Sequence, residues 1–363
     1  MQDHESVFSS GKLKFGDKLN FPDFNFKLKA KWHPDSSVTL ERVKKANFPY
    51  LSSYYKNKDA VESYQNQRIP FYCALIYPNA LKDRIFLVMQ CGDMLTIMDD
   101  NFTHPKIIDN PNALSILEAQ FSHALDGTRP PDAYPIAQLL HDNYRPILET
   151  YPSGSLVRKR VRDALKDMIT ILSHPPVHNI TTLTFDEYVD ARRIDVFATL
   201  MATLIEYAID VDIGDALEES EDLREMRQAT IDLVLFVHDV CSFLKEFSSK
   251  EAMNGIWVLA RQYDLSIQQA INKLVGLARE RERDLIAARN RILASALGQR
   301  IDVRRYMTEL EHLHSGTVEF HTLSSRYIGQ NREGPFISGE VTVEPMILPL
   351  HILGPDFIPS GVK

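Results

Sequence analysis

Residues 238–246, His-Asp-Val-Cys-Ser-Phe-Leu-Lys-Glu, decide the interpretation of this chain. His238, Ser242 and Glu246 are four residues apart, so in an α-helix of about 3.6 residues per turn they lie within roughly 80° of arc. The flanking sequence is rich in Leu, Val and Phe, which predicts a buried helix. An imidazole, a hydroxyl and a carboxylate on one stripe of a buried helix carry a desolvation cost. Packing gives no reason for that stripe, whereas binding of a hard divalent cation does.

Three further patterns accompany this stretch. The acidic pair Asp99-Asp100 closes a helix-like segment, LVMQCGDMLTIM. A second pattern, Tyr-x-x-x-Arg-x-x-Asp, comprises Tyr188, Arg192 and Asp195. The third lies near the C-terminal end and comprises Gly316, Phe320, Ser324, Arg326 and Tyr327. Acidic pairs and Arg-Tyr pairs are weak signals alone, so their order and spacing carry the argument.

Taken together, the four patterns resemble the motifs of microbial, fungal-like class I terpene synthases, over roughly residues 60–330. The second metal motif of that family is Asn-Asp-x-x-Ser-x-x-Lys/Arg-Glu, which differs here at His238 alone among its fixed positions. The acidic pair resembles the first metal motif, and the others resemble the pyrophosphate-sensing and Arg-Tyr patterns. The resemblance implies an enzyme with an all-α fold, a single-domain helical bundle around a central active-site cavity.

The resemblance also implies roles for individual residues. It implies Mg²⁺ ligands at Asp99, His238, Ser242 and Glu246. It implies that a prenyl diphosphate is bound by Arg192, Lys245, Arg326, Tyr327 and Phe320. Arg192 would sense the diphosphate, Asp195 would relay that contact, and Val196 would lie at the turn nearest the reacting carbon. An aromatic ring such as Phe320 can stabilise a cation through its face.

The expected reaction is ionisation and cyclisation of farnesyl diphosphate to a cyclic sesquiterpene. Geranyl or geranylgeranyl diphosphate stay open as alternatives, because the depth of a cavity is not readable from a sequence. A non-catalytic helical protein with the same fold is a further alternative. Its basis is three departures from the family pattern: His238 in place of Asn, Phe320 in place of Trp, and Thr103-His104 where another acidic residue is common.

Composition limits the class of protein. The chain has 363 residues, of which 44% are hydrophobic, enough for a large core. A net charge of -8 argues against nucleic acid or an anionic membrane as partners. No run approaches the ~20 apolar residues of a membrane span, and no signal-peptide pattern is present. We therefore expect a cytoplasmic protein, monomeric or homodimeric, that contacts neither membrane nor nucleic acid.

The chain divides into three segments that differ in proline and glycine content and in helical periodicity. Residues 1–59 contain Pro22, Pro34 and Pro49 and predict an irregular strap with short helices. Residues 60–330 have helical periodicity and form the predicted terpene synthase domain, including a long amphipathic helix with Ser266 as N-cap. Residues 331–363 are rich in Pro and Gly and predict a tail without helical structure.

Overall fold

The computed structural model of the chain describes residues 12–102, 107, 110–174, 180–328 and 338–346. Within these residues the protein is mostly helical, with two short strands, which confirms the predicted all-α class. The first helices are α2 (Ser36–Tyr55), α3 (Lys58–Asn66), α4 (Pro70–Ile76), α5 (Ile85–Phe102), α7 (Pro111–Leu125), α8 (Pro135–Glu149) and α9 (Leu156–Ser173). They are followed by α10 (Phe185–Asp195), α11 (Ala198–Ile209), α12 (Ala216–Glu219), α13 (Glu221–Ser249), α14 (Gly255–Gln262), α15 (Ile267–Leu293), the 3-10 helix η2 (Leu297–Gln299), α16 (Ile301–Leu323) and α17 (Ser325–Ile328).

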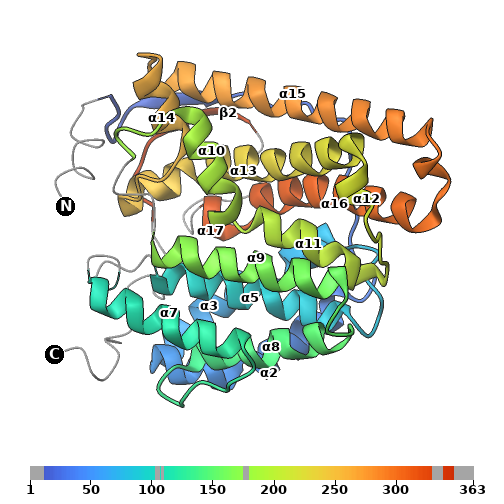
Figure 1. Cartoon of the computed structure of the whole chain (residues 1–363). Helices are drawn as coiled ribbons and strands as arrows, with labels where there is room; N and C mark the ends of the chain where they lie inside the picture. Colours follow the sequence, from blue (N-terminus) through green and yellow to red (C-terminus); the bar gives the residue numbers. More distant parts are fainter. Residues whose placement is uncertain (1–11, 103–106, 108–109, 175–179, 329–337, 347–363) are drawn as a thin grey trace.

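The helices pack in two groups around one continuous hydrophobic core. In Figure 1, α15, α13 and α16 run in the upper half, and α9, α5, α7, α8 and α2 lie in the lower half. Helix α13 packs mainly against α15 and α16. Helix α16 also contacts α4, which in turn contacts α5, so α4 joins the two groups. Among the described residues, no helix has both the length and the apolar character that crossing a membrane would require.

Helix α13 is the long central helix that the opening motif predicts. Ser220 caps its N-terminus by accepting a hydrogen bond from the Leu223 N–H, and Lys250 ends it in the left-handed conformation, with φ of 60°. From Ala229 to Phe247 every side chain except that of His238 is buried. The polar stripe of the motif therefore does lie on a buried helix, as its apolar surroundings predict.

Helix α15 confirms the predicted long amphipathic helix and its cap. The Ser266 side chain accepts a hydrogen bond from the Gln269 N–H, and the Gln269 side chain bonds back to the Ser266 backbone, which completes a capping box. Its buried side chains recur every three or four residues from Ile267 to Ile292 and face α13 and α14. The opposite face carries charged residues, as expected for a helix on the surface of the bundle.

Gly316, the first residue of the C-terminal pattern, has a packing reason. A Cβ atom at this position would lie 2.5 Å from the backbone oxygen of Leu75 in α4, much closer than atoms can approach. A residue without a side chain therefore lets α16 rest directly on the backbone of α4. The same contact fixes the end of α16 that carries Phe320.

The two ends of the described chain meet in a small sheet. Strand β1 (Lys18–Phe21) pairs antiparallel with β2 (Gly339–Thr342), with Lys18 opposite Thr342. The backbone N–H of Met346 donates to Ser248 Oγ at 3.2 Å, and the Phe15 ring lies 5.1 Å from that of Phe247. Both ends are thus attached to the last turns of α13, next to the predicted Lys245 and Glu246.

The N-terminal segment differs from its prediction in one respect. It contains α2, a helix of 20 residues, where only short helices are expected. Pro49 lies inside α2 and lacks the N–H of one helical hydrogen bond, but the helix continues because Val43, Asn47 and Leu51 are buried on both sides of it. The division at residues 59 and 331 stays a prediction, and most of the tail lies outside the described residues.

Candidate active site

The predicted site residues come from five helices. They are Asp99 in α5, Arg192 and Asp195 in α10, His238, Ser242, Lys245 and Glu246 in α13, Phe320 in α16, and Arg326 with Tyr327 in α17. Except in α13, each lies in the last turns of its helix or in the short helix α17. Val196 ends α10, and Phe197 has a φ of 62°, so the chain turns there before α11. Val196 thus lies at a turn, and its place nearest the reacting carbon stays a prediction.

Arg192 joins the end of α10 to α13. Its Nη1 bonds Asp195, its Nε lies 3.3 Å from Asp239 Oδ1, and its Nη2 lies 3.4 Å from Glu246 Oε1. The same Nη2 lies 3.3 Å from His238 Nδ1. The side chain is only 9% exposed. A cation this deeply buried needs surrounding carboxylates to offset its desolvation.

Asp239 is a fully buried carboxylate that is contacted from α10 and from α14. It lies about 100° around α13 from His238 and accepts hydrogen bonds from the Tyr188 hydroxyl and, at 2.8 Å, from the Gly255 N–H at the start of α14. Burial alone raises the pKa of Asp239, but Arg192 and the neighbouring donors lower it overall. An ionised Asp239 therefore orients Arg192 rather than facing a metal.

A seven-residue repeat on α13 extends this attachment. Asp232, Asp239 and Glu246 are seven residues apart and so lie on one face over about four turns. Arg193 donates from Nε and Nη2 to the two oxygens of Asp232 at 2.7 and 3.2 Å, while Arg192 contacts the other two carboxylates. In the sequence the Arg192-Arg193 pair is typical of a surface. In the structure it fixes α10 along α13.

The other two predicted diphosphate-binding cations are also paired with carboxylates. Lys245 Nζ lies 2.9 and 2.8 Å from the two oxygens of Glu251, and Arg326 Nη2 lies 2.7 Å from Asp100 Oδ1. Both cations are buried. Asp100 belongs to the acidic pair but had no predicted role of its own, and its contact brings α17 to the end of α5.

His238 stands where the family pattern has Asn. Its Nδ1 lies 3.4 Å from Ser242 Oγ and 3.3 Å from Arg192 Nη2. Histidine Nδ1 and asparagine Oδ1 are both bonded to Cγ, so each presents an acceptor atom at the same distance along the side chain. Burial lowers the pKa of His238, and Arg192 adds to this effect, although Asp239 opposes it. The neutral ring is therefore favoured, with Nδ1 accepting the contact from Arg192.

Aromatic rings line the neighbourhood of His238. Tyr327 stacks on His321 with ring centroids 4.4 Å apart, and the His238 ring meets Tyr327 edge-on at 5.8 Å. Phe320 is buried, with its ring 5.0 Å from that of Tyr72. The structure thus places Tyr327 against His238 of the polar stripe, while Phe320 lies behind it, with its ring 6.3 Å from that of Tyr327. Their contact with a substrate stays a prediction.

The acidic side chains oppose one another's ionisation. Burial, together with repulsion from Asp100 and Asp195, raises the pKa of Asp99 to about 7. Burial likewise raises the pKa of Glu246 to about 7, and the Glu251 carboxylate adds to this shift against the pull of Arg192. The ends of α5, α10 and α13 therefore bring carboxyl groups together at a buried place, where their charged forms are disfavoured.

This donor set fits a divalent metal ion. Asp99, Ser242 and Glu246 offer hard oxygen ligands, and a bound cation would relieve the repulsion between the carboxylates. Within the part of the chain that the structure describes, no three acidic, His or Cys side chains already form a metal cage. Mg²⁺ needs no such cage, because it is often held by one or two carboxylates and the phosphates of a substrate.

Sequence reasoning missed several residues that shape the site. Glu251 and Asn254 lie in the connection between α13 and α14, and the Asn254 Nδ2 donates to Glu246 Oε2 at 2.8 Å. Asn before Gly-Ile was a recognisable N-cap signal, and Asn254 does cap α14. No signal in the sequence indicated its contact with Glu246. Thr103 and His104 lie outside the described residues.

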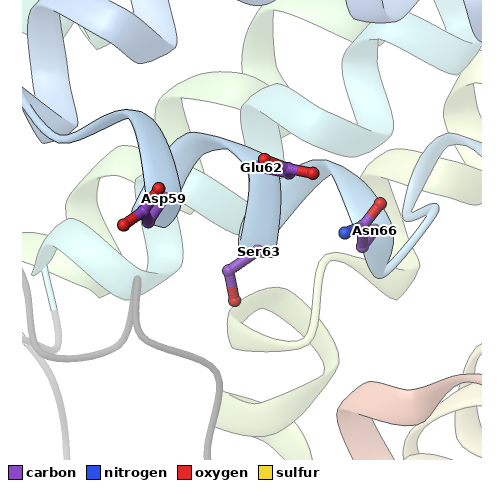
Figure 2. A pocket seen from close by; sticks show the side chains of 4 residues that line it. All are labelled: Asp59, Glu62, Ser63 and Asn66. Atoms are coloured by element: carbon purple, nitrogen blue, oxygen red, sulfur yellow. The ribbon is translucent and has the colours of Figure 1, made fainter.

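A pocket elsewhere on the protein has a different character. It is open to solvent, has a volume of about 350 Å³, and is lined by Asp59, Glu62, Ser63 and Asn66 (Figure 2). All four belong to α3 and follow a helical spacing, so they form one polar face of that helix. None of the predicted site residues lines this pocket, and a solvated acidic face explains it.

Comparisons with known proteins agree with this geometry. The family model "Terpene synthase family 2, C-terminal metal binding" matches residues 90–284, more than half of the 363 residues. The match includes the predicted residues of α5, α10 and α13, and it ends before those of α16 and α17.

Individual relatives are distant. The terpene cyclase braA of Annulohypoxylon truncatum is 28% identical over 143 residues, 39% of this chain and 38% of its own length. A microbial terpene synthase-like protein of Selaginella moellendorffii is 22% identical over 78% of this chain and 80% of its own. The crystal structure of germacradien-4-ol synthase from Streptomyces citricolor superposes with a TM-score of 0.71 at 16% identity, covering 83% of this chain and 98% of that one, and so shares the fold. The chain belongs to the terpene synthase family, whose members are lyases that act on prenyl diphosphates.

Proposed function

We propose that the protein ionises farnesyl diphosphate in a Mg²⁺-dependent reaction and cyclises it to a sesquiterpene, with release of diphosphate. The observation that carries this proposal is the cluster of Arg192, His238, Ser242 and Glu246, where the end of α10 meets α13. Arg326 and Asp99, from α17 and α5, are electrostatically coupled to one another and complete the arrangement of cations and carboxylates. Cations for a diphosphate and carboxylates for a metal are thus available together.

In this proposal each residue keeps the role that the resemblance implies. Asp99, His238, Ser242 and Glu246 hold Mg²⁺, which when bound supplies positive charge to the diphosphate leaving group. Arg192, Lys245 and Arg326 bind diphosphate oxygens, Arg in bidentate fashion, and Tyr327 adds a hydroxyl donor. The allylic C–O bond breaks and its electron pair leaves with the diphosphate. The cyclised cation then becomes a neutral hydrocarbon by loss of a proton, or an alcohol by addition of water and loss of a proton. Phe320 is assigned the role of stabilising the resulting cation through its ring face, Asp195 that of relaying the contact of Arg192, and Val196 the turn nearest the reacting carbon.

We propose farnesyl diphosphate as the substrate because the chain resembles fungal members of the terpene synthase family in its length. Geranyl and geranylgeranyl diphosphate are the alternative substrates. The non-catalytic alternative loses support, because the acidic, basic and hydroxyl groups of the motifs lie in one cluster, in which Arg192 contacts His238 and Glu246, and His238 contacts Ser242. We further propose that the protein is cytoplasmic and that it is a monomer or a homodimer. Sedimentation of the purified protein tests the oligomeric state.

Product analysis tests the proposed function directly. Purified protein is incubated with each of the three prenyl diphosphates and Mg²⁺, and the extracts are analysed by gas chromatography with mass spectrometry. Excess EDTA and the E246Q variant serve as controls. We expect a cyclic C15 product from farnesyl diphosphate that both controls abolish. Diphosphate release from none of the three substrates would favour the non-catalytic alternative.

A further inference from the structure

Glu251 is an acidic residue of the site that none of the sequence motifs includes. It follows Lys250, whose left-handed conformation ends α13, and its backbone N–H donates to the Glu246 carbonyl at 2.8 Å. These two features reverse the chain direction in the manner of a Schellman motif. The Glu251 side chain is therefore brought back alongside the last turns of α13.

The Glu251 carboxylate holds the Lys245 ammonium. Its two oxygens lie 2.8 and 2.9 Å from Lys245 Nζ, and Ser249 Oγ donates to one of them at 2.6 Å. Burial alone raises the pKa of Glu251, but Lys245 and the hydrogen bonds from Lys245 and Ser249 lower it overall. The contact is thus between two charged groups.

Glu251 also lies within electrostatic reach of the rest of the site. Arg326 lowers the pKa of Glu251, while Glu251 in turn raises that of Glu246. The carboxylate therefore lies among the groups that would bind diphosphate and metal. An anion that binds Lys245 has to compete with it.

The two partners differ in their exposure to solvent. The Lys245 side chain is 8% exposed, whereas that of Glu251 is 39% exposed. If the pair separates, Glu251 can be hydrated, while Lys245 stays buried and needs another anion. A diphosphate carries more negative charge than one carboxylate and can supply that anion.

We propose that Glu251 is a positioning residue that holds Lys245 in place in the substrate-free protein and is displaced from it by diphosphate. This inference depends on the proposed function, because it assumes that Lys245 binds the diphosphate of the substrate. Glu251 then lowers the affinity for free pyrophosphate, the product of ionisation, and so favours its release. A ligand role for Glu251 on the metal would have the opposite effect on affinity.

Calorimetric titration with inorganic pyrophosphate in the presence of Mg²⁺ tests the inference. The proteins compared are the wild type, E251Q, K245M and the double variant. E251Q keeps the size of the side chain and an acceptor for Ser249 but removes the charge. We expect E251Q to bind pyrophosphate about fivefold more tightly than the wild type, or better, in line with the loss of a competing partly buried charge. K245M should bind more weakly, and the double variant should bind like K245M.

Three outcomes would overturn the inference. They are unchanged affinity in E251Q, weaker affinity in E251Q as expected for a metal ligand, and equal tightening with and without Lys245. If the wild type does not bind pyrophosphate, the proposed function itself fails. D163N, which removes an exposed charge paired with Lys159 on α9, is the matched control and should leave the affinity unchanged. If E251Q does not fold, S249A is the second variant, because it removes the hydrogen bond from Ser249 to the Glu251 carboxylate. S249A should also bind pyrophosphate more tightly than the wild type. Unchanged affinity in S249A would count against the inference.

Discussion

The Nε of Arg192 lies 3.3 Å from Oδ1 of Asp239, and this contact sets the direction in which the guanidinium faces the site. Asp239 is itself fixed by the Tyr188 hydroxyl and by the first N–H of α14. Because Nε contacts Asp239, the two terminal nitrogens of Arg192 point toward Asp195, Glu246 and His238. A residue that lies off the proposed metal-binding stripe of α13 thus positions Arg192, the proposed diphosphate sensor.

Asp239→Asn tests this positioning role. The substitution removes the charge that orients Arg192 but keeps the side-chain volume, so we expect kcat to fall by about tenfold or more. Breaking a buried charge pair also costs stability, about 3 kcal/mol, because Arg192 loses one of its partners. Steady-state kinetics and urea unfolding measure the two effects. Normal kcat together with reduced stability would show that Asp239 serves the fold alone.

Arg192→Lys separates charge from geometry. Lysine keeps the positive charge but loses the planar group that contacts Asp239 and Glu246 together, so we expect turnover to fall by about tenfold while the helical fold is retained. Rates of diphosphate release, compared with circular dichroism spectra, check this result. A variant that ionises farnesyl diphosphate at the parental rate would assign Arg192 a structural role.

The helices could be predicted because their signals are local. The spacing of apolar residues in α15 and its Ser266 cap can be read from neighbouring residues of the sequence. The apolar residues that predict the burial of α13 are also neighbours in the sequence. The length of α2 was missed because Pro49 normally argues against a helix, whereas here buried neighbours on both sides sustain it. Pairing of β1 with β2 could not be predicted either, since it joins residues more than 300 positions apart.

The site could be predicted only as far as its motifs extend. Arg192, Glu246 and Arg326 were identified as charged residues at characteristic spacings, and Asp195 as a partner of Arg192, but their other partners in the folded chain were not. Asp100 pairs with Arg326 only because the ends of α5 and α17 meet in three dimensions, whereas Glu251 pairs with Lys245 because the turn that ends α13 brings Glu251 back along that helix. Single acidic residues near a helix end are common in any sequence, so nothing distinguishes these two before folding is known.

Glu246→Gln and Asp99→Asn test the assignment of acidic metal ligands. We expect each to reduce turnover by at least about a hundredfold, because a neutral amide binds Mg²⁺ much more weakly than a carboxylate. Folding should be retained, since Gln at 246 still accepts the hydrogen bond from Asn254. Product formation and circular dichroism measure both properties. Near-normal activity in either variant would remove that residue from the metal site.

Asp93 predicts a pH dependence of stability away from the site. It accepts hydrogen bonds from Asn47 and Tyr64 within the bundle, and burial raises its pKa to about 7. The folded protein therefore binds a proton that the unfolded chain, with an Asp pKa of about 4, has lost. The stability that this residue contributes is present below about pH 4 and is lost as the pH rises to about 7.

Asp93→Asn removes this titration while an amide can still bond Asn47 and Tyr64. Relative to the wild type, the variant should gain stability between about pH 4.5 and pH 8, by at least about 1 kcal/mol. Urea unfolding of both proteins at the two pH values measures the change. D163N again serves as the control, because its carboxylate is exposed. Parallel pH profiles for the wild type and D93N would contradict the prediction.

His238→Asn restores the residue of the family pattern and tests whether the histidine acts as a weakened ligand. An amide oxygen suits Mg²⁺ better than an imidazole nitrogen, so we expect half-maximal turnover at a several-fold lower Mg²⁺ concentration. Asparagine Oδ1 can accept the hydrogen bond that His238 Nδ1 now accepts from Arg192, while the edge-on contact with Tyr327 is lost at a cost of about 1 kcal/mol. Titrating Mg²⁺ against turnover measures the first effect, with H123N on the exposed face of α7 as the control. A weaker response to Mg²⁺ in H238N would show that His238 has left the metal site for a structural role.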